Sequence, residues 1–255
     1  SEGSVIIHSS TCPIMNNEPS YDPTELRARR EDVRRRMARA CEKAGRSLDE
    51  VCLVAVSKTH PPGAIEVLYE AGVRDFGESY VQEWLEKAPI LPADIRWHFI
   101  GGLQSNKARF VVEQGIFLVH SVDRKSLAKQ LATRTDRQVD VLIQVDVSGE
   151  ETKGGVPPDE LFALFEKVRN YSSLRVRGLM TMPPYADDPE ESRPYFQRLR
   201  VLLEELLIHC AKNQIPTAGL EWLSMGMTND FEVAIEEGAT HIRVGTALFG
   251  ERTTQ

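Results

Sequence analysis

The sequence predicts an α/β fold, a single (β/α)8 TIM barrel with an extra N-terminal helix. Three observations predict it: eight short β-rich segments, amphipathic segments between them, and short connections. This alternation is typical of parallel strands joined by right-handed crossovers, and eight such units in roughly 230 residues fit a closed barrel. An open doubly wound sheet is the alternative. We expect a flexible N-terminal tail over residues 1–21 and one barrel domain over residues 22–255.

The first helix is expected directly after the tail. Asp22 is expected to cap it, with Pro23 at its first position and Glu25 completing a capping box. Gly45 predicts its end. Apolar residues recur between these signals at helical spacing and predict the buried stripe: Leu26, Val33, Met37, Ala40 and Ala44.

The opposite face of this helix is rich in arginine. A nucleic-acid interface is one interpretation, because such interfaces carry clustered cations. However, Glu31, Asp32 and Glu42 are interspersed and the whole chain is acidic, so we favour a solvated helix face. The arginines are Arg27, Arg29, Arg30, Arg34, Arg35, Arg36 and Arg39.

The alternation of strands and helices begins after this helix. Segments rich in β-branched and aromatic residues predict eight strands: Val51–Ser57, Val73–Phe76, Ile95–Ile100, Phe117–Val122, Val139–Val147, Leu174–Met182, Glu221–Ser224 and Thr240–Val244. Amphipathic segments predict five helices between them: Pro61–Ala71, Ser105–Gln114, Lys125–Thr133, Asp159–Tyr171 and Glu190–Lys212.

Composition excludes several classes of protein. The chain has 255 residues, of which 41% are hydrophobic, and its net charge is 31 − 38 = −7. This hydrophobic share excludes global disorder, and the acidity argues against a nucleic-acid partner. No apolar run approaches the ~20 residues of a membrane span and no signal peptide opens the chain, so we expect a cytoplasmic protein. The scattered cysteines predict reduced thiols and no metal site: Cys12, Cys41, Cys52 and Cys210.

The most informative single residue is Lys58. It directly follows an apolar strand, and active sites of these barrels lie at the C-terminal ends of the strands. Partial burial there lowers the pKa of a lysine, and a neutral amine can form a Schiff base with an aldehyde. By position alone, an ordinary surface lysine is the alternative.

Two glycine-containing segments follow the seventh and eighth strands. They read Ser224-Met225-Gly226-Met227 and Arg243-Val244-Gly245-Thr246. The loops at these positions of a barrel commonly bind phosphate, and glycines let backbone N–H groups approach an anion closely. Either segment alone would be an ordinary glycine turn. Together with Lys58 they predict one ligand with an aldehyde at one end and a phosphate at the other.

These residues belong to six blocks that resemble the pyridoxal phosphate homeostasis protein family, a single-domain relative of the alanine racemase barrel. The resemblance extends from about Leu26 to Arg252. The blocks are Val54–Lys58 (VAVSK), Phe76–Glu83 (FGESYVQE), Trp97–Lys107 (WHFIGGLQSNK), Arg177–Met182 (RGLMTM), Leu223–Phe231 (LSMGMTNDF) and Ile242–Gly250 (IRVGTALFG).

The resemblance implies a fold-type III barrel that holds pyridoxal 5′-phosphate (PLP) as a Schiff base on Lys58. It also implies that Ser224, Gly245 and Thr246 bind the phosphate, while Met225 and Gly226 line that loop. Arg243 would approach the pyridine nitrogen, where a permanently charged guanidinium makes the ring a poorer electron sink than an aspartate would.

Three further residues surround the expected site. Ser79 stands where the family usually has asparagine, so its contact with the cofactor is expected to be weaker or water-mediated. His98 could be an acid–base group, but we favour a buried histidine bonded to neighbouring backbone. Lys153 could contact the phosphate from a mobile loop, but a solvated loop lysine is the simpler interpretation.

The resemblance favours a PLP-binding protein without catalytic activity that helps to regulate the supply of the cofactor. The Lys58 Schiff base would exchange with an incoming amine, from an amino acid or an apo-enzyme lysine, and we expect a monomer. A PLP-dependent amino-acid racemase is the first alternative. Its second acid–base residue would come from a C-terminal domain, for which the end of the chain leaves no room. A Schiff-base aldolase that acts on a sugar phosphate without PLP is the second alternative.

Overall fold

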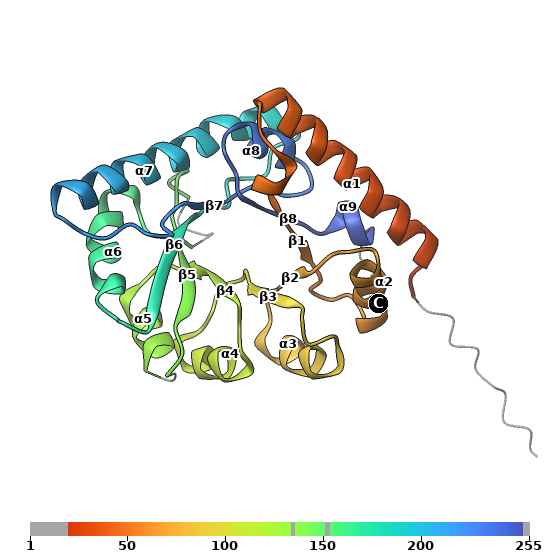
Figure 1. Ribbon diagram of the computed structural model, residues 1–255, viewed down its shortest axis with the longest axis horizontal. Coiled ribbons are helices and arrows are strands. Elements are labelled where there is room, and N and C mark those ends of the chain that lie inside the picture. The colour runs from red at the N-terminus through yellow and green to blue at the C-terminus, as the bar shows by residue number, and fades with distance from the viewer. Residues whose placement is uncertain (1–19, 134–135, 151–153, 252–255) are drawn as a thin grey trace, which may run out of the picture.

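The chain forms a closed barrel of eight parallel strands, as predicted. The computed structural model describes residues 20–133, 136–150 and 154–251. Its strands follow one another in chain order, and β8 pairs with β1 (Figure 1). They are β1 (Cys52–Val56), β2 (Asp75–Glu78), β3 (Arg96–Phe99), β4 (Leu118–Val122), β5 (Val139–Gln144), β6 (Leu174–Met180), β7 (Trp222–Ser224) and β8 (His241–Val244).

Helices cover the outside of the barrel, and the six predicted from apolar periodicity are confirmed. Three short helices, α3, α8 and α9, were not predicted because seven, six and four residues leave little room for a period. No helix in the described ranges combines the length and apolar character needed to cross a membrane. The helices are α1 (Pro23–Ala44), α2 (Pro62–Glu70), α3 (Val81–Lys87), α4 (Ala108–Gln114), α5 (Lys125–Ala132), α6 (Leu161–Arg169), α7 (Arg193–Lys212), α8 (Phe231–Glu236) and α9 (Thr246–Phe249).

Most strand ends differ from the prediction by one or two residues, and the shifts in β2 and β5 have local reasons. β2 starts two residues late, because the Val73 N–H donates to the Leu68 carbonyl and completes the turn that ends α2. β5 stops at Gln144, because the chain turns back and Val156 pairs beside Val145.

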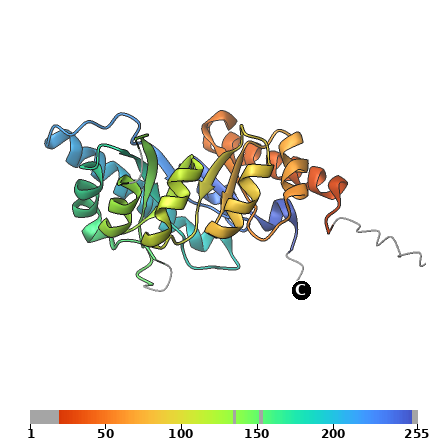
Figure 2. The same cartoon turned by 90° about the horizontal axis from the view of Figure 1, so that it is seen from below.

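Helix α1 lies outside the barrel and packs against α2, α8 and α9 (Figures 1 and 2). The Asp22 cap is confirmed, since its side chain accepts from the Thr24 N–H at 2.9 Å, and Gly45 ends the helix with a φ of 67°. The capping box is wrong, because Glu25 pairs with Arg29 instead.

The arginine face of α1 is not uniformly solvated. Arg36 is half-buried, forms an ion pair of 2.7 Å with Glu232 of α8, and lies over the ring of Phe231. Arg35 follows the prediction, pairing with Asp32 on the exposed surface. The helix is therefore attached to the barrel partly through its basic face.

Most of the predicted tail, together with Cys12 and Lys153, lies outside the described residues. Tyr21 is described and packs against the hydrophobic core. Its hydroxyl approaches Gly63 so closely that a Cβ there would lie 2.0 Å away. Ordered packing therefore reaches at least one residue into the segment predicted as tail.

Gly178 lets β6 and β7 approach each other closely. Its φ is 153°, and a Cβ at this position would lie 1.8 Å from the carbonyl oxygen of Trp222. We expect Gly178→Ala to lower the free energy of unfolding by about 3 kcal/mol, because backbone must shift to relieve the overlap. Urea denaturation measures this. Gly102→Ala, whose Cβ would meet no atom within 4 Å, is the control; an equal loss in both variants would contradict the prediction.

Candidate functional site

Lys58 lies two residues beyond the end of β1, at the C-terminal mouth of the barrel, and is half-buried. The following residue, Thr59, has a φ of 68°, which is unusual for a β-branched residue. Its N–H donates to the carboxylate of Glu83 in α3, which holds the turn. Backbone strain of this kind often occurs at functional sites. The turn fixes the point from which the lysine side chain extends.

A buried charge cluster lies beside this turn. Nζ of Lys87, from α3, donates to the Ser57 carbonyl at 2.8 Å, to Oε1 of Glu78 at 2.7 Å and to Oε1 of Glu83 at 2.9 Å. Because all three of its protons are donated, Lys87 is held as a cation and is a poor nucleophile. Of these two lysines, Lys58 is the better candidate for Schiff-base chemistry.

Glu78 has one partnered and one unpartnered oxygen. Oε2 is buried and has no hydrogen bond to the described part of the chain. Burial raises the pKa of Glu78 to about 7, against the opposing charges of Lys87 and Lys58. Near neutral pH the carboxyl group can therefore donate as well as accept. An unsatisfied buried oxygen within electrostatic reach of Lys58 is what a site completed by a bound polar group would leave.

The loops that follow β7 and β8 are hydrogen-bonded to each other. The Arg243 N–H donates to the Gly226 carbonyl at 2.9 Å, and the Ala247 N–H donates to Oγ1 of Thr228 at 3.1 Å. The two glycine segments recognised in the sequence therefore form one continuous surface.

Backbone donors on this surface are available to a ligand. Among the residues described, the N–H groups of Gly226, Gly245 and Thr246 have no acceptor. Gly245 lies against Val56 at the end of β1, since its Cβ would be 3.4 Å from the Val56 Cβ. The free donors therefore lie on the same side of the barrel as Lys58, and together they suit an anion.

Met225 and Gly226 give the loop after β7 its shape. Met225 is fully buried in the hydrophobic core. Gly226 has a φ of 100°, and a Cβ there would lie 2.6 Å from the Cβ of Ala234 in α8. Only glycine fits this position, so the loop is held close to α8.

Ser79 follows β2 and is half-buried. Its backbone packs against Gly101, where a Cβ would lie 2.7 Å from the Ser79 Cβ. The Ser79 hydroxyl has no hydrogen-bond partner in the described ranges and remains available to a ligand.

Arg243 is buried inside the barrel, with 2% of its surface exposed. Nη1 donates to Oγ of Ser224 at 2.6 Å, and Nη2 donates to the Thr181 carbonyl at 3.0 Å. Burial lowers the pKa of Arg243 to about 10, so the guanidinium is still charged at neutral pH. Its position is fixed by the last residue of β7 and by the residue that follows β6.

A chain of hydrogen bonds continues from Arg243 across the barrel interior, and we call it the buried relay. Oγ of Ser224 lies 2.8 Å from Nδ1 of His120, Nε2 of His120 lies 2.8 Å from Nδ1 of His98, and Nε2 of His98 lies 2.9 Å from Oδ1 of Asp75. All five members are at most 6% exposed. The relay joins Asp75 at the start of β2 to Arg243 in β8.

The two ends of the buried relay determine its direction. A guanidinium can only donate and a carboxylate can only accept. Ser224 therefore accepts from Arg243 and donates to His120, which donates to His98, which donates to Asp75. Each histidine carries one proton, on Nε2, and no buried donor or acceptor along the relay is left unpaired.

The pKa values of the buried groups agree with this direction. Burial, with the nearby rings of His98 and His241 and the charge of Arg243, lowers the pKa of His120 well below its usual value. Burial lowers the pKa of His241 to about 3. Burial alone would raise the pKa of Asp75, but hydrogen bonds from His98 and Arg96 hold it well below its usual range. The barrel interior thus contains neutral histidines and an ionised aspartate.

Two sequence expectations concern members of the relay. The burial of His98 is confirmed, but its expected backbone partners are wrong, because it bonds to the side chains of Asp75 and His120. A phosphate contact by Ser224 stays a prediction. Its hydroxyl is fully buried and already serves Arg243 and His120, so contacting a phosphate would require it to release one of them.

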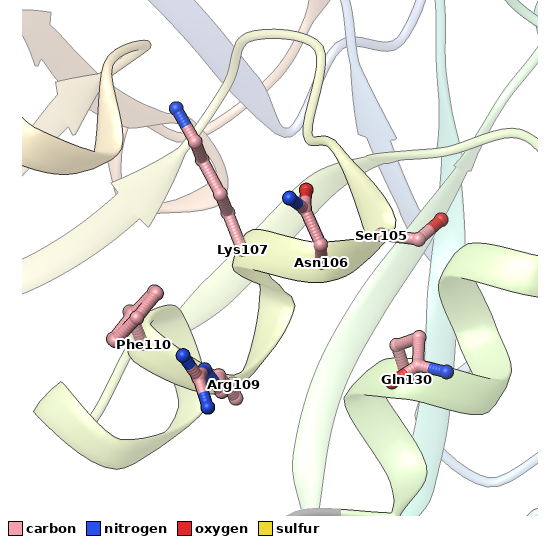
Figure 3. A pocket seen from close by; sticks show the side chains of 6 residues that line it. All are labelled: Ser105, Asn106, Lys107, Arg109, Phe110 and Gln130. Atoms are coloured by element: carbon pink, nitrogen blue, oxygen red, sulfur yellow. The ribbon is translucent and has the colours of Figure 1, made fainter.

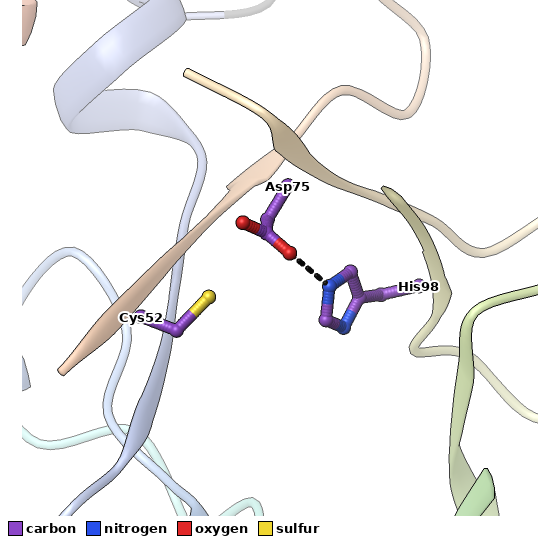
Figure 4. Close-up of side chains that lie close together, drawn as sticks. All are labelled: Cys52, Asp75 and His98. Atoms are coloured by element: carbon purple, nitrogen blue, oxygen red, sulfur yellow. Dashed lines mark hydrogen bonds and ion pairs between the residues drawn. The ribbon is translucent and has the colours of Figure 1, made fainter. Parts of the chain in front are cut away.

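Cys52, Asp75 and His98 bring three potential metal ligands within 4.8 Å of one another (Figure 4). Asp75 is already occupied, however, since Nε and Nη2 of Arg96 donate to its two oxygens at 3.0 and 2.7 Å. Burial and the neighbouring Asp75 also raise the pKa of the Cys52 thiol well above its usual value. A cation would have to displace a guanidinium here, so we assign these groups to the end of the buried relay.

A surface hollow of about 590 Å³ lies outside the barrel, between η3 (Ser105–Lys107), α4 and α5 (Figure 3). Its side chains include Lys107, Arg109 and Phe110. None of the residues predicted to bind the cofactor lines it. The hollow is therefore separate from the site at the barrel mouth.

Sequence reasoning missed several residues of the site. Glu78 is the last residue of β2, whose residues are all buried, and a carboxylate there could have been recognised as unusual. His120 is likewise a polar residue within an apolar strand. Lys87 lies on α3, a helix that was not predicted, and Thr181 contributes a backbone carbonyl that no side-chain pattern could indicate.

Comparisons with known proteins agree with this fold. The family model "Alanine racemase, N-terminal domain" matches residues 30–253. A pyridoxal phosphate homeostasis protein from Aquifex aeolicus is 48% identical, covering 86% of this chain and 95% of that protein; one from Pseudomonas aeruginosa is 44% identical, covering 86% and 93%. The structure of PipY from Synechococcus elongatus with PLP bound has a TM-score of 0.74 at 37% identity, covering 88% of this chain and all of that one (100%). The chain therefore belongs to the alanine racemase N-terminal domain family and, within it, to the pyridoxal phosphate homeostasis proteins.

Proposed function

We propose that this protein binds PLP at the C-terminal mouth of the barrel and takes part in PLP homeostasis. The observation that carries the proposal is that an amine, Lys58, and three backbone N–H groups that suit an anion lie on the same rim of the barrel. The names of the relatives and the PLP-bound PipY structure support it.

Each residue has a defined part in this proposal. Lys58 forms the Schiff base with the aldehyde, and the N–H groups of Gly226, Gly245 and Thr246 bind the phosphate. Arg243 faces the pyridine nitrogen. Three further residues complete the site: Ser224 orients Arg243, Met225 supports the phosphate loop from below, and Ser79 offers its hydroxyl to the ring substituents.

The proposed role is cofactor binding and hand-over without turnover. An amine from an amino acid or an apo-enzyme lysine would exchange with Lys58. A charged Arg243 beside the ring supports this role, because it cannot protonate the pyridine nitrogen and so leaves the ring a weak electron sink. We propose that the protein acts as a monomer in the cytoplasm; the free thiols of Cys41, Cys52 and Cys210 support a reducing compartment.

Titration of the purified protein with PLP tests the proposal. We expect a yellow protein with a Schiff-base absorption band that saturates at one PLP per chain. A protein that stays colourless and takes up no PLP would contradict it and would favour a Schiff-base aldolase. Chiral analysis of alanine and other amino acids after incubation with the PLP-loaded protein separates binding from racemisation, and sustained turnover would overturn the non-catalytic role.

A further inference from the structure

A second hollow lies at the opposite end of the barrel from Lys58, between α1 and the N-terminal ends of β1 to β3. Its volume is about 320 Å³. Cys52 and Asp75, whose side chains are drawn in Figure 4, form part of its wall, and much of the rest is apolar, including Met37 and Val73. We call it the arginine pocket, because four arginines line it: Arg30, Arg34, Arg74 and Arg96.

Two of these arginines are neutralised by neighbouring acids. Arg96 forms a two-pronged ion pair with Asp75. Arg74 lies 3.4 Å from the carboxylate of Asp94 and also donates to backbone carbonyls. These pairs neutralise Asp75, which lines the pocket, and Asp94, which pairs with a lining arginine.

The two arginines from α1 are not neutralised in this way. Arg30 makes no hydrogen bond or ion pair within the described ranges, and its Nε is buried. Arg34 has only a 4.0 Å contact with Glu31, and both side chains are more than half exposed. Burial and the charge of Arg34 lower the pKa of Arg30, against the opposing charge of Glu31. Two cations one helical turn apart thus face the pocket with too little negative charge beside them.

We propose that the arginine pocket binds a small organic phosphate monoester. A guanidinium presents a planar fork of donors that matches phosphate oxygens, so the phosphate would bind to Arg30 and Arg34 and give the buried Nε its acceptor. The pocket volume suits a small ligand, and its apolar wall suits an organic body. This inference does not depend on PLP binding at Lys58, which lies at the other end of the barrel.

Isothermal titration calorimetry of the full chain at low salt tests the proposal, with phenyl phosphate as the probe. Inorganic phosphate and phenol separate the contributions of the anion and the apolar body. Each titration is run on the unloaded protein and on protein whose PLP has been fixed to Lys58 by borohydride reduction and whose free PLP has been removed, so that binding at the mouth is recognised by its loss in the loaded protein. Arg30→Gln removes one of the two arginines proposed to bind the phosphate. Arg35→Gln is the matched control, because Arg35 lies on the same helix but pairs with Asp32 on the exposed surface.

We expect phenyl phosphate to bind to the PLP-loaded protein, freed of unbound PLP, at least tenfold more tightly than inorganic phosphate or phenol. Arg30→Gln should weaken this binding at least tenfold and Arg35→Gln should leave it unchanged, with thermal melting showing that both variants are folded. No binding, equal loss in both variants, or equal affinity for inorganic phosphate would overturn the proposal. Absence of the PLP band would refute the proposed function alone, since the dependence on Arg30 would remain.

Discussion

Replacing Lys58 by alanine is expected to abolish the Schiff-base absorption band that PLP gives with the wild-type protein. The lysine provides the only covalent link in the proposed site, so we expect the whole band to disappear while the fold is retained. Retention of the fold follows from the position of Lys58 beyond β1, where its half-buried side chain is not part of the strand ladder. Absorbance titration measures the loss, and far-ultraviolet circular dichroism checks the fold.

Lys107→Ala is the matched control for this prediction. Lys107 is an exposed lysine that also follows a barrel strand, yet it lines a hollow outside the barrel. It should keep the full band. Borohydride reduction of the wild-type complex should place the added mass on the peptide that contains Lys58. A band that survives in Lys58→Ala would show that another lysine is the anchor.

The position of Lys58 could be predicted because functional sites in this fold lie at the C-terminal ends of the strands. An apolar strand followed by lysine, and two glycine segments after the last strands, are visible in the sequence without knowledge of any contact. The barrel then brings these ends to one rim. This argument needs only the order of the strands, and the order is confirmed.

The buried relay could not be predicted in the same way. Whether His98 and His120 meet depends on the register between β3 and β4, in which His98 pairs with Leu118 rather than with His120. Barrel strands are apolar on both faces, so alternation in the sequence does not show which side points inward. The partners of Asp75 and Ser224 depend on the stagger of the whole barrel. Such a network of hydrogen bonds is visible only in the three-dimensional structure.

As the pH is lowered, the wild-type protein is expected to lose stability relative to a variant that lacks His120. His120 is neutral in the folded protein because its pKa lies well below the unfolded value of about 6.5. Below that pH the unfolded chain takes up a proton that the folded protein does not. Stability contributed by this group is therefore present above about pH 6.5 and lost as the pH falls, by about 1.4 kcal/mol per pH unit.

At pH 7.5, His120→Gln should be less stable than the wild type by about 2 kcal/mol, because buried partners in His98 and Ser224 lose their hydrogen bonds. Below pH 6.5 this difference should narrow by about 1.4 kcal/mol per pH unit and then reverse its sign, since the variant no longer carries the titrating group. Other groups that titrate in this range, including Glu78 and His241, are present in both proteins and largely cancel. Urea denaturation at a series of pH values measures the difference.

Ser224→Ala provides the control, since it interrupts the same relay without removing a titrating group. Its destabilisation should stay nearly constant from pH 7.5 to pH 4.5. If His120→Gln behaved in the same way, the folded protein would have to protonate His120 as readily as the unfolded chain does. Arg243 would then face a cation one serine away, and the direction of hydrogen bonds derived for the relay would be wrong. A difference that narrows only in His120→Gln would instead show that the interior is built to keep this histidine neutral, with the carboxylate of Asp75 and the guanidinium of Arg243 holding opposite charges at the two ends.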